Sequence, residues 1–136
     1  MNRVPRLLAL AAFLTGSARL DARTLALVTG VGNYDDPRNN LDCLEADMAN
    51  VRRLVTGPLG VAPSDLLVLT DRQATAPAII QAFRSHLVQK AGREDTVVFY
   101  YSGHGYHVPD LNGDEEDGQD EILAPYGVDS AFWRPG

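Results

Sequence analysis

The sequence predicts an α/β fold in which a parallel sheet carries helices on both of its faces. Three short apolar segments, residues 24–31, 66–69 and 96–101, alternate with two segments whose apolar residues recur at helical spacing. This alternation is typical of a parallel sheet, because each helix returns the chain to start the next strand in the same direction. The 136 residues, 45% of them hydrophobic and 22% charged, suit one globular domain.

The first predicted strand, Thr24 to Val31, is a nearly continuous apolar run that ends among glycines. Such a run suits a strand that is buried on both faces. The first predicted helix follows a polar loop and ends at Gly57-Pro58. The apolar residues that give it helical spacing are Leu41, Leu44, Met48, Val51 and Leu54.

The second predicted strand covers residues 66–69, and Thr75 can cap the helix that follows it. Pro77 is tolerated in the first turn of that helix, where no backbone N–H is needed. The third predicted strand, residues 96–101, is rich in β-branched and aromatic side chains. The predicted core stripe of the second helix consists of Ile79, Ile80, Phe83, Leu87 and Val88.

The first 23 residues have the pattern of a secretory signal peptide. Arg3 and Arg6 precede an apolar run at residues 7–14, and small residues up to Ala22 offer cleavage points. Eight apolar residues cannot span a bilayer, which takes about 20, so no stable membrane span is expected. We therefore expect an exported protein, periplasmic or secreted, with its domain at residues 24–136. If this segment is instead an N-terminal helix or follows a wrong start codon, the protein would be cytoplasmic.

The negative charge of the chain is concentrated in one segment. There are 12 Lys and Arg against 18 Asp and Glu, and seven of these carboxylates lie within residues 110–121. The rest of the chain is nearly balanced, at 12 basic against 11 acidic residues, and the acidic total argues against a nucleic-acid partner. The acidic segment is predicted to be a loop, either simply solvated or able to bind a cation.

His104 is the candidate catalytic residue. It follows the third predicted strand, and ligands in open α/β sheets bind beyond the carboxyl ends of strands. Gly103 and Gly105 leave its imidazole accessible, and an imidazole exchanges protons near neutral pH.

These residues also carry a resemblance to a known family. The segment 98–129 contains Tyr-Ser-Gly-His-Gly and, at residues 112–118, Asn-Gly-Asp-Glu-Glu-Asp-Gly. It is similar to the histidine segment of the caspase-like cysteine peptidases, and its acidic part resembles the metacaspase branch. Residues 26–34, 41–47 and 69–71 resemble the first strand, the first helix and the end of the second strand of that family. The resemblance implies the N-terminal part of a caspase-like, Rossmann-like α/β domain.

The resemblance implies hydrolysis of peptide bonds by a Cys-His dyad, with His104 as its histidine. In caspases the histidine lies about 50 residues before the cysteine, whereas this sequence continues for only 32 residues after His104, without a cysteine. We therefore expect the nucleophile to lie beyond Gly136 and the 136 residues alone to be inactive. Cys43, the single cysteine, is expected to be a small buried hydrophobe. The alternative is a catalytically inactive caspase-like fragment that serves as a calcium-responsive or partner-binding module.

The resemblance also implies a substrate and a cation. Asp47 and Ser102 match residues that line a pocket for Arg or Lys at the cleavage position, so the expected partners are basic protein or peptide substrates. Asp120 matches a calcium ligand, and no organic cofactor is expected. Two extra residues interrupt the family's pattern at residues 125–129. Self-association is also expected, because a sheet without its later strands has an unpaired edge.

An EF-hand is disfavoured as the source of calcium binding. Asp110, Asn112, Asp114 and Glu121 occupy positions 1, 3, 5 and 12 of an EF-hand-like loop. Glu115, however, replaces the turn glycine at position 6, and no helical pattern precedes Asp110.

Overall fold

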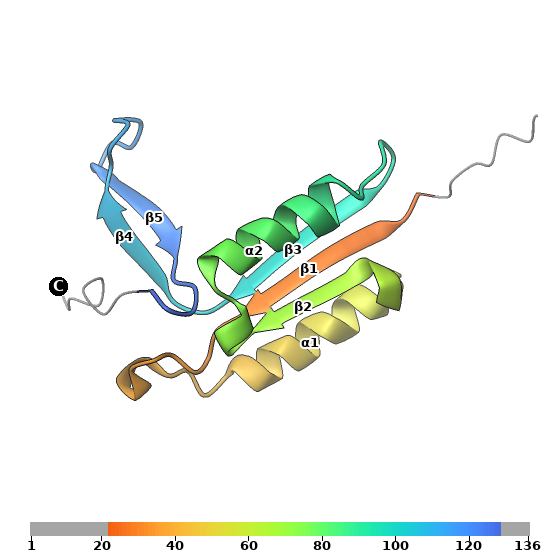
Figure 1. The fold of residues 1–136 in the computed structure, drawn as a ribbon, viewed down its shortest axis with the longest axis horizontal. Helices are drawn as coiled ribbons and strands as arrows, with labels where there is room; N and C mark the ends of the chain where they lie inside the picture. Colours follow the sequence, from red (N-terminus) through yellow and green to blue (C-terminus); the bar gives the residue numbers. More distant parts are fainter. Residues whose placement is uncertain (1–21, 129–136) are drawn as a thin grey trace, which may run out of the picture.

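A computed structural model describes residues 22–128, and these form a parallel sheet with an appended hairpin (Figure 1). The sheet consists of β1 (Thr24–Gly30), β2 (Leu66–Thr70) and β3 (Thr96–Ser102), in the order β2-β1-β3. The three predicted strands are thus confirmed. Gly30 pairs in register with both Thr70 and Ser102, so all three strands end at one edge of the sheet. Ser102 lies at this edge, and His104 lies just beyond it.

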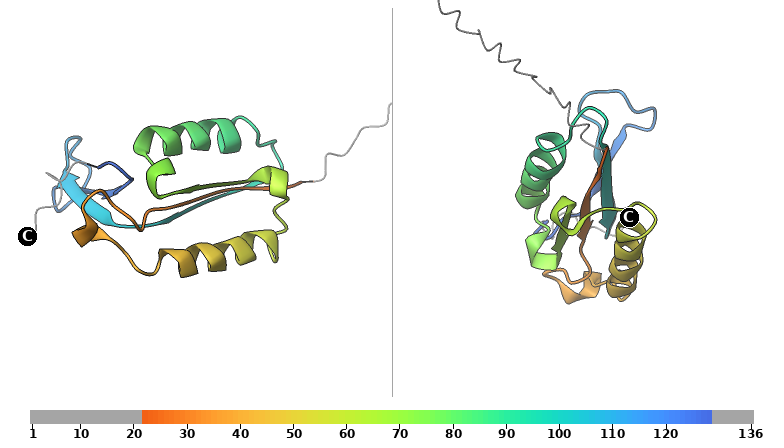
Figure 2. Two further views of the ribbon diagram at one scale, coloured as in Figure 1. Left: turned by 60° about the horizontal axis from the view of Figure 1, so that its bottom comes forward. Right: turned by 90° about the vertical axis from the view of Figure 1, so that its right-hand side faces the viewer.

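Helices cover both faces of the sheet, as predicted (Figure 2). Helix α1 (Leu44–Thr56) packs on one face, and α2 (Ala76–Ala82) continues into η4 (Phe83–Val88), a π-helical segment, on the other. Single-turn 3-10 segments, η1 (Pro37–Asn39), η2 (Pro63–Asp65) and η3 (Asp71–Gln73), occupy the connections. In the described residues, no helix has the length and apolar character needed to cross a membrane.

The alternation of side chains along β1 divides the core into two layers. Ala26 and Val28 pack toward α1, while Leu25 and Leu27 pack toward α2 and η4. All four residues are fully buried, which confirms that β1 is covered on both faces. On the α1 side the buried helix residues are Leu44, Met48, Val51 and Val55.

Leu54 is a correction to the predicted core. Its side chain is 50% exposed, and the neighbouring Val55 is fully buried instead. The two residues are adjacent and both apolar, so helical spacing alone could not decide which of them faces the sheet. The buried series is spaced by four, three and four residues from Leu44 onward, and Val55 continues it.

The stripe predicted for the second helix is also partly wrong, because only Leu87 of its five residues is fully buried. The π-helical turn of η4 changes the angular spacing of residues 83–88 from that of an α-helix. Phe83 instead lies edge-on against Phe99 of β3, with ring centroids 5.7 Å apart. Five apolar residues of α2, η4 and β3 are between 39% and 61% exposed, and we call them the apolar patch: Ile80, Phe83, Val88, Val97 and Phe99.

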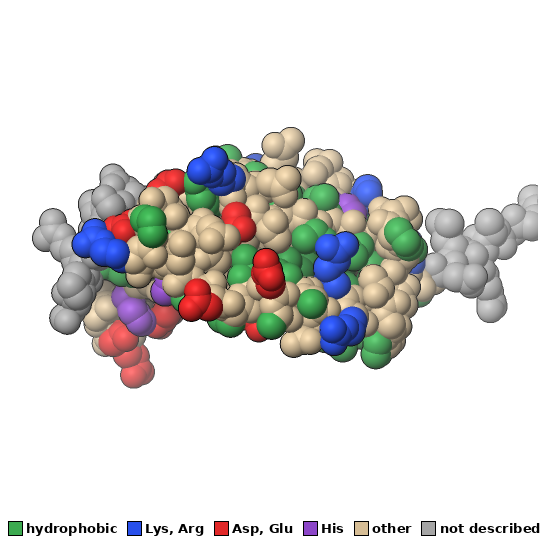
Figure 3. Space-filling view, turned by 90° about the horizontal axis from the view of Figure 1, so that it is seen from below, with side chains coloured by type: hydrophobic (Ala, Val, Ile, Leu, Met, Phe, Trp, Pro, Cys, Tyr) green, Lys and Arg blue, Asp and Glu red, His purple; other side chains and the backbone are tan. Residues whose placement is uncertain are grey.

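The acidic segment contains a strand that the sequence did not predict. Strands β4 (Gly105–Pro109) and β5 (Gln119–Leu123) pair as an antiparallel hairpin, so only the residues between them form a loop. Acidic side chains gather beside a histidine at the end of the molecule that carries the hairpin (Figure 3). Asp120 and Glu121 made this strand difficult to predict from the sequence, because acidic residues are depleted in β-strands.

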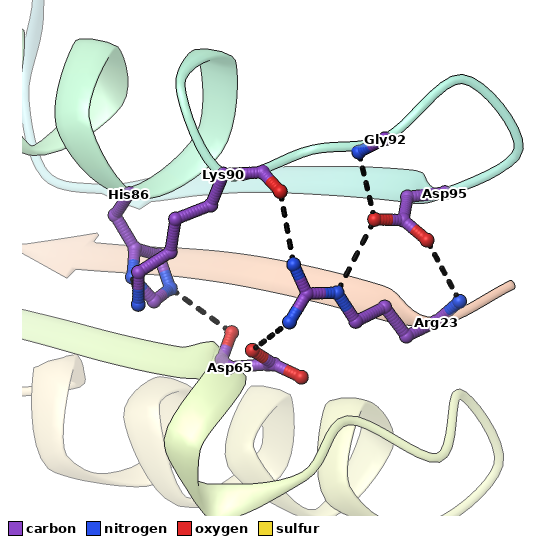
Figure 4. A network of polar contacts seen from close by, with 6 residues as sticks. All are labelled: Arg23, Asp65, His86, Lys90, Gly92 and Asp95. Atoms are coloured by element: carbon purple, nitrogen blue, oxygen red, sulfur yellow. Dashed lines mark hydrogen bonds and ion pairs between the residues drawn. The ribbon is translucent and has the colours of Figure 1, made fainter. Parts of the chain in front are cut away.

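A polar network fastens the other end of the sheet, where the strands begin (Figure 4). The Arg23 guanidinium donates to Asp65 and to Asp95, each at 3.2 Å, and to the Lys90 carbonyl at 2.9 Å. His86 Nε2 lies 3.0 Å from the Asp65 carbonyl; a carbonyl only accepts, so this nitrogen carries the proton. The network joins the starts of all three strands and lies at the opposite end of β3 from His104. The predicted signal peptide falls almost entirely outside the described residues.

Candidate active site

His104 lies two residues after β3. Hydrogen bonds hold both its main chain and its imidazole ring. Its N–H donates to Tyr34 Oη at 2.9 Å, and its carbonyl accepts the Ala124 N–H at 2.9 Å. Its Nε2 lies 2.9 Å from the Asn39 carbonyl. Since that carbonyl can only accept, Nε2 carries a proton, and in the neutral imidazole Nδ1 then carries the lone pair. The contact therefore makes Nδ1 the basic nitrogen of His104.

Two tyrosines meet at the start of the segment that follows the hairpin. The hydroxyls of Tyr34 and Tyr101 both donate to the Ala124 carbonyl, at 3.2 and 2.5 Å. Burial raises the pKa of Tyr101, and the neighbouring Tyr34 phenol raises it further, so Tyr101 stays protonated at neutral pH. Gly103 is required beside them, because a Cβ there would lie 2.5 Å from Tyr101 Oη.

The two predicted pocket residues lie in contact. Ser102, at the end of β3, donates its hydroxyl to Asp47 Oδ2 at 2.9 Å. Asp47 belongs to the first turn of α1, which passes close over the sheet at Gly30. A Cβ on Gly30 would lie 2.6 Å from Leu44 Cδ1, so a side chain there would push α1 away. The result is a half-buried carboxylate at the same sheet edge as His104.

Three aspartates of the hairpin converge. Asp110, Asp114 and Asp120 each offer a carboxylate oxygen within 4.8 Å of the others. The carboxylate of Asp110 also accepts the N–H groups of Glu115 at 3.1 Å and Gly113 at 2.7 Å. These two bonds hold the pKa of Asp110 below its usual value, so the group stays ionised. Asp120, the predicted ligand, is thus one of three converging carboxylates. The resemblance had implied only Asp120 as a ligand of the cation.

The contacts around this cluster do not form an EF-hand, in agreement with the sequence. Strand β4 precedes Asp110, where an EF-hand would have a helix. Glu121, which would close such a loop at position 12, contacts His107 Nδ1 at 3.5 Å. Successive residues of a strand point to opposite faces, which separates Glu121 from Asp120.

Cys43 is exposed at the start of α1 and is not the buried hydrophobe that was predicted. It occupies the N-cap position, where its carbonyl accepts the Asp47 N–H at 3.1 Å while its side chain caps nothing. The position is therefore fixed by the backbone and leaves the thiol at the surface.

The sequence did not single out the residues that support His104. Tyr34 and Asn39 lie in the connection between β1 and α1, in which the resemblance covers Tyr34 but assigns it no role. Asn39 acts through its carbonyl, which every residue type possesses, so no side-chain pattern could reveal it. The same connection borders a polar cavity of about 630 Å³ at the carboxyl ends of β1 and β2.

A parallel sheet covered on both faces, with a histidine beyond its carboxyl edge, is consistent with part of a caspase-like α/β domain. A family model described as the metacaspase, peptidase C14 domain matches residues 25–131, so the chain belongs to the metacaspase family.

Curated fungal metacaspases are similar to this chain over most of its length. Metacaspase-1A of Aspergillus niger is 36% identical over 114 residues, which cover 79% of this chain and 28% of the relative. Metacaspase-1 of Candida glabrata is 35% identical over 119 residues, which cover 83% of this chain and 30% of the relative. Metacaspase-1 of Cryptococcus neoformans is 38% identical over 111 residues, which cover 78% of this chain and 24% of the relative. The chain thus spans about a quarter of the length of these relatives.

Proposed function

We propose that this chain supplies the histidine and part of the substrate pocket of a cysteine endopeptidase. The observation that carries the proposal is the bond between His104 Nε2 and the Asn39 carbonyl at 2.9 Å. This bond leaves Nδ1 as the basic nitrogen for proton transfer and would stabilise the imidazolium that forms during catalysis. Membership of the metacaspase family supports the same assignment.

In the proposed reaction a cysteine outside the described residues gives its thiol proton to His104 Nδ1. The thiolate forms a bond to the scissile carbonyl carbon, and the carbonyl electron pair moves to the oxygen. When the tetrahedral intermediate collapses, the C–N bond breaks and Nδ1–H protonates the leaving amine. Water, activated by the same nitrogen, then hydrolyses the acyl-enzyme and releases the thiol.

The direct test uses a product that extends this chain through a cysteine-bearing segment. We expect it to hydrolyse peptide amides with Arg or Lys at the cleavage position, whereas the 136 residues alone do not. If the folded longer product is inactive, the peptidase proposal fails. Calcium binding by that inactive product would instead favour a non-catalytic, calcium-responsive module, for which the aspartate cluster is the supporting feature.

Cleavage after basic residues is proposed from the pair of Asp47 and Ser102. Ser102 donates to one oxygen of the Asp47 carboxylate, which keeps the negative charge in place and oriented. A half-buried carboxylate favours a cationic side chain, because the ion pair forms where water screens it less than at the surface. Arg and Lys fit this requirement.

We further propose that the aspartate cluster of the hairpin binds calcium. Calcium takes six to eight oxygen ligands at about 2.3–2.6 Å, so oxygens on opposite sides of the ion lie about 5 Å apart. The oxygens of Asp110, Asp114 and Asp120, within 4.8 Å of one another, fit around one such ion. Three carboxylates in this space repel one another, and a divalent cation relieves the repulsion.

For calcium we predict weak, Asp120-dependent binding by the 136-residue chain. Three protein ligands leave water to complete the shell, so a dissociation constant of about 10⁻⁴–10⁻³ M is expected. At tenfold excess over that constant, binding stabilises the fold by about 1.4 kcal/mol. Titration calorimetry and thermal melts should show both effects in the wild type and not in Asp120→Ala. Glu116→Ala, in the same acidic loop but outside the cluster, is the matched control; equal heats in wild type and Asp120→Ala would exclude Asp120 as a ligand.

Export through the N-terminal segment is also proposed. The structure supports a cleavage point near Ala22, because Arg23, the next residue, makes the contacts that fasten the starts of the strands. Cleavage before Arg23 would leave that network whole. A mature N-terminus at or near Arg23 in the exported protein would support the proposal, and an uncleaved intracellular product would contradict it.

Self-association through the apolar patch is proposed for the 136-residue chain. Within residues 22–128, β3 pairs only with β1, so its outer edge lies open beside the patch. We expect oligomers at micromolar concentration in size exclusion with light scattering, and a shift toward monomer in Val97→Lys, because a lysine on an edge strand opposes pairing. Leu111→Lys, at a residue that is 94% exposed in the hairpin loop, is the control. A wild-type monomer with a cooperative melt contradicts the proposal.

A further inference from the structure

We propose that Tyr34 is a positioning residue that holds His104 in its basic tautomer and orientation; this rests on the proposed function in taking His104 as the catalytic base. The Tyr34 side chain contacts both the backbone and the imidazole ring of His104. Tyr34 Oη accepts the His104 N–H at 2.9 Å, and the Tyr34 ring lies 5.2 Å from the imidazole, tilted by 49°. The Tyr34 residue is only 7% exposed, so these contacts are largely shielded from water.

The hydroxyl of Tyr34 also fixes His104 relative to the chain that follows the hairpin. It donates to the Ala124 carbonyl at 3.2 Å, while the Ala124 N–H donates to the His104 carbonyl at 2.9 Å. The three groups close a ring of hydrogen bonds around the His104 backbone. Tyr101 contacts the same carbonyls but not the His104 N–H: its hydroxyl donates to the Ala124 carbonyl at 2.5 Å and lies 3.5 Å from the His104 carbonyl.

Tyr34 is itself held by the connection that supplies the Asn39 carbonyl. Its N–H donates to Asn40 Oδ1 at 2.8 Å, which ties Tyr34 to the residue directly after Asn39. The backbone group that binds the imidazole and the phenol that binds the His104 amide therefore belong to one short, cross-linked segment. The bond from Leu41 N–H to the Gly32 carbonyl, at 2.8 Å, closes this segment at its base.

Asp71, the first residue of η3 directly after β2, anchors the same segment. Its carboxylate accepts the N–H groups of Gly32 and Asn33 at 2.9 and 2.8 Å, and the Asn33 side-chain amide at 3.1 Å. Asp71 adopts a φ of 47°, a left-handed conformation that Asp and Asn tolerate better than most residues other than glycine. Partial burial opposes ionisation of Asp71, but the bonds from Asn33 and Gly32 outweigh it and lower its pKa. An ionised acceptor thus holds the residues that directly precede Tyr34.

The contacts assign separate tasks to the two groups that hold His104. Asn39 fixes which ring nitrogen carries the proton, and Tyr34 fixes the backbone from which the ring projects. Without the Tyr34 hydroxyl, the half-buried His104 N–H loses its acceptor and the histidine can shift away from Asn39. The Nε2–H tautomer then loses its advantage, and Nδ1 is no longer the dominant base.

The test compares Tyr34→Phe with the wild type in the 136-residue chain, by nitrogen NMR of the imidazole above pH 8, where histidine is neutral. We expect the Nε2–H tautomer to dominate in the wild type and the Nδ1–H share to rise severalfold in Tyr34→Phe. Amide exchange of His104 should accelerate at least about tenfold, as the loss of one hydrogen bond implies. Tyr126→Phe is the matched control, because that hydroxyl bonds Asp35 and Arg72 and leaves His104 unchanged.

Unchanged tautomer shares and His104 exchange in a folded Tyr34→Phe would overturn the proposal. If that variant loses amide protection across β1 and β3, Asp71→Asn takes its place. Asparagine tolerates the positive φ but removes the charge and one acceptor that hold the segment, so a smaller shift in the same direction is expected, and no shift there overturns the proposal. These measurements need no nucleophile, so they separate failure of the positioning role from failure of the peptidase proposal.

Discussion

Replacing His104 with alanine is expected to lower the hydrolysis of Arg-ended peptide amides by about 10²–10⁴-fold, the usual contribution of a general acid–base. The variant is made in the product that carries a cysteine-bearing segment, and kcat is measured at saturating substrate. His104 is half-buried beyond β3, and its Nδ1 is the basic nitrogen because Nε2 donates to Asn39. Alanine leaves neither a base for the thiol nor an acid for the leaving amine.

His107→Ala is the matched control for this experiment. It lies on β4, three residues from His104, and its exposed ring faces Glu121 at 3.5 Å on the hairpin. We expect it to retain wild-type kcat, because its ring is exposed and contacts Glu121 on the neighbouring strand of the hairpin. Comparable activity in wild type and His104→Ala would remove His104 from the dyad, and an equal loss in both variants would point to damage of the hairpin rather than to proton transfer.

Much of the sheet was predictable because its apolar runs are short and its helices are marked by spacing and caps. Thr75 illustrates this: it was predicted as a cap, and its side chain accepts the Ala78 N–H. The errors arise where local patterns are ambiguous. Leu54 and Val55 are adjacent and both apolar, so the sequence could not show which of them is buried. The π-helical turn at Phe83 could not be predicted, because the pattern was interpreted with α-helical spacing.

The candidate site was predictable only for residues whose side chains carry the chemistry. His104 was indicated by its position at a strand end, and Asp47 and Ser102 by the resemblance. Their hydrogen bond at 2.9 Å brings together residues that are 55 positions apart in the sequence. The supports of His104 escaped prediction because one is a main-chain carbonyl and the other, Tyr34, passes for an ordinary buried aromatic residue.

Replacing Asp47 with asparagine is expected to lower kcat/KM for Arg- and Lys-ended substrates by about 10–100-fold, the range for loss of one charge-assisted hydrogen bond. The exchange keeps the size of the side chain, and the asparagine oxygen can still accept the Ser102 hydroxyl. The packing of α1 over Gly30 is therefore preserved while the charge is removed. Hydrolysis is measured in the longer product with substrates that differ only at the cleavage position.

The role of Asp47 is decided by whether kcat/KM falls only for substrates with a charged residue at the cleavage position. If its carboxylate recognises a cation, substrates with an uncharged residue of similar length at the cleavage position should change by less than about threefold, because they never formed the ion pair. Glu45→Gln removes a charge from the same first turn of α1, but from an exposed residue, and should leave both substrate classes unchanged. An equal loss for charged and uncharged substrates would mean that Asp47 acts through Ser102, by holding the end of β3 beside His104. Residues outside the described part of the chain would then determine the substrate specificity of the pocket.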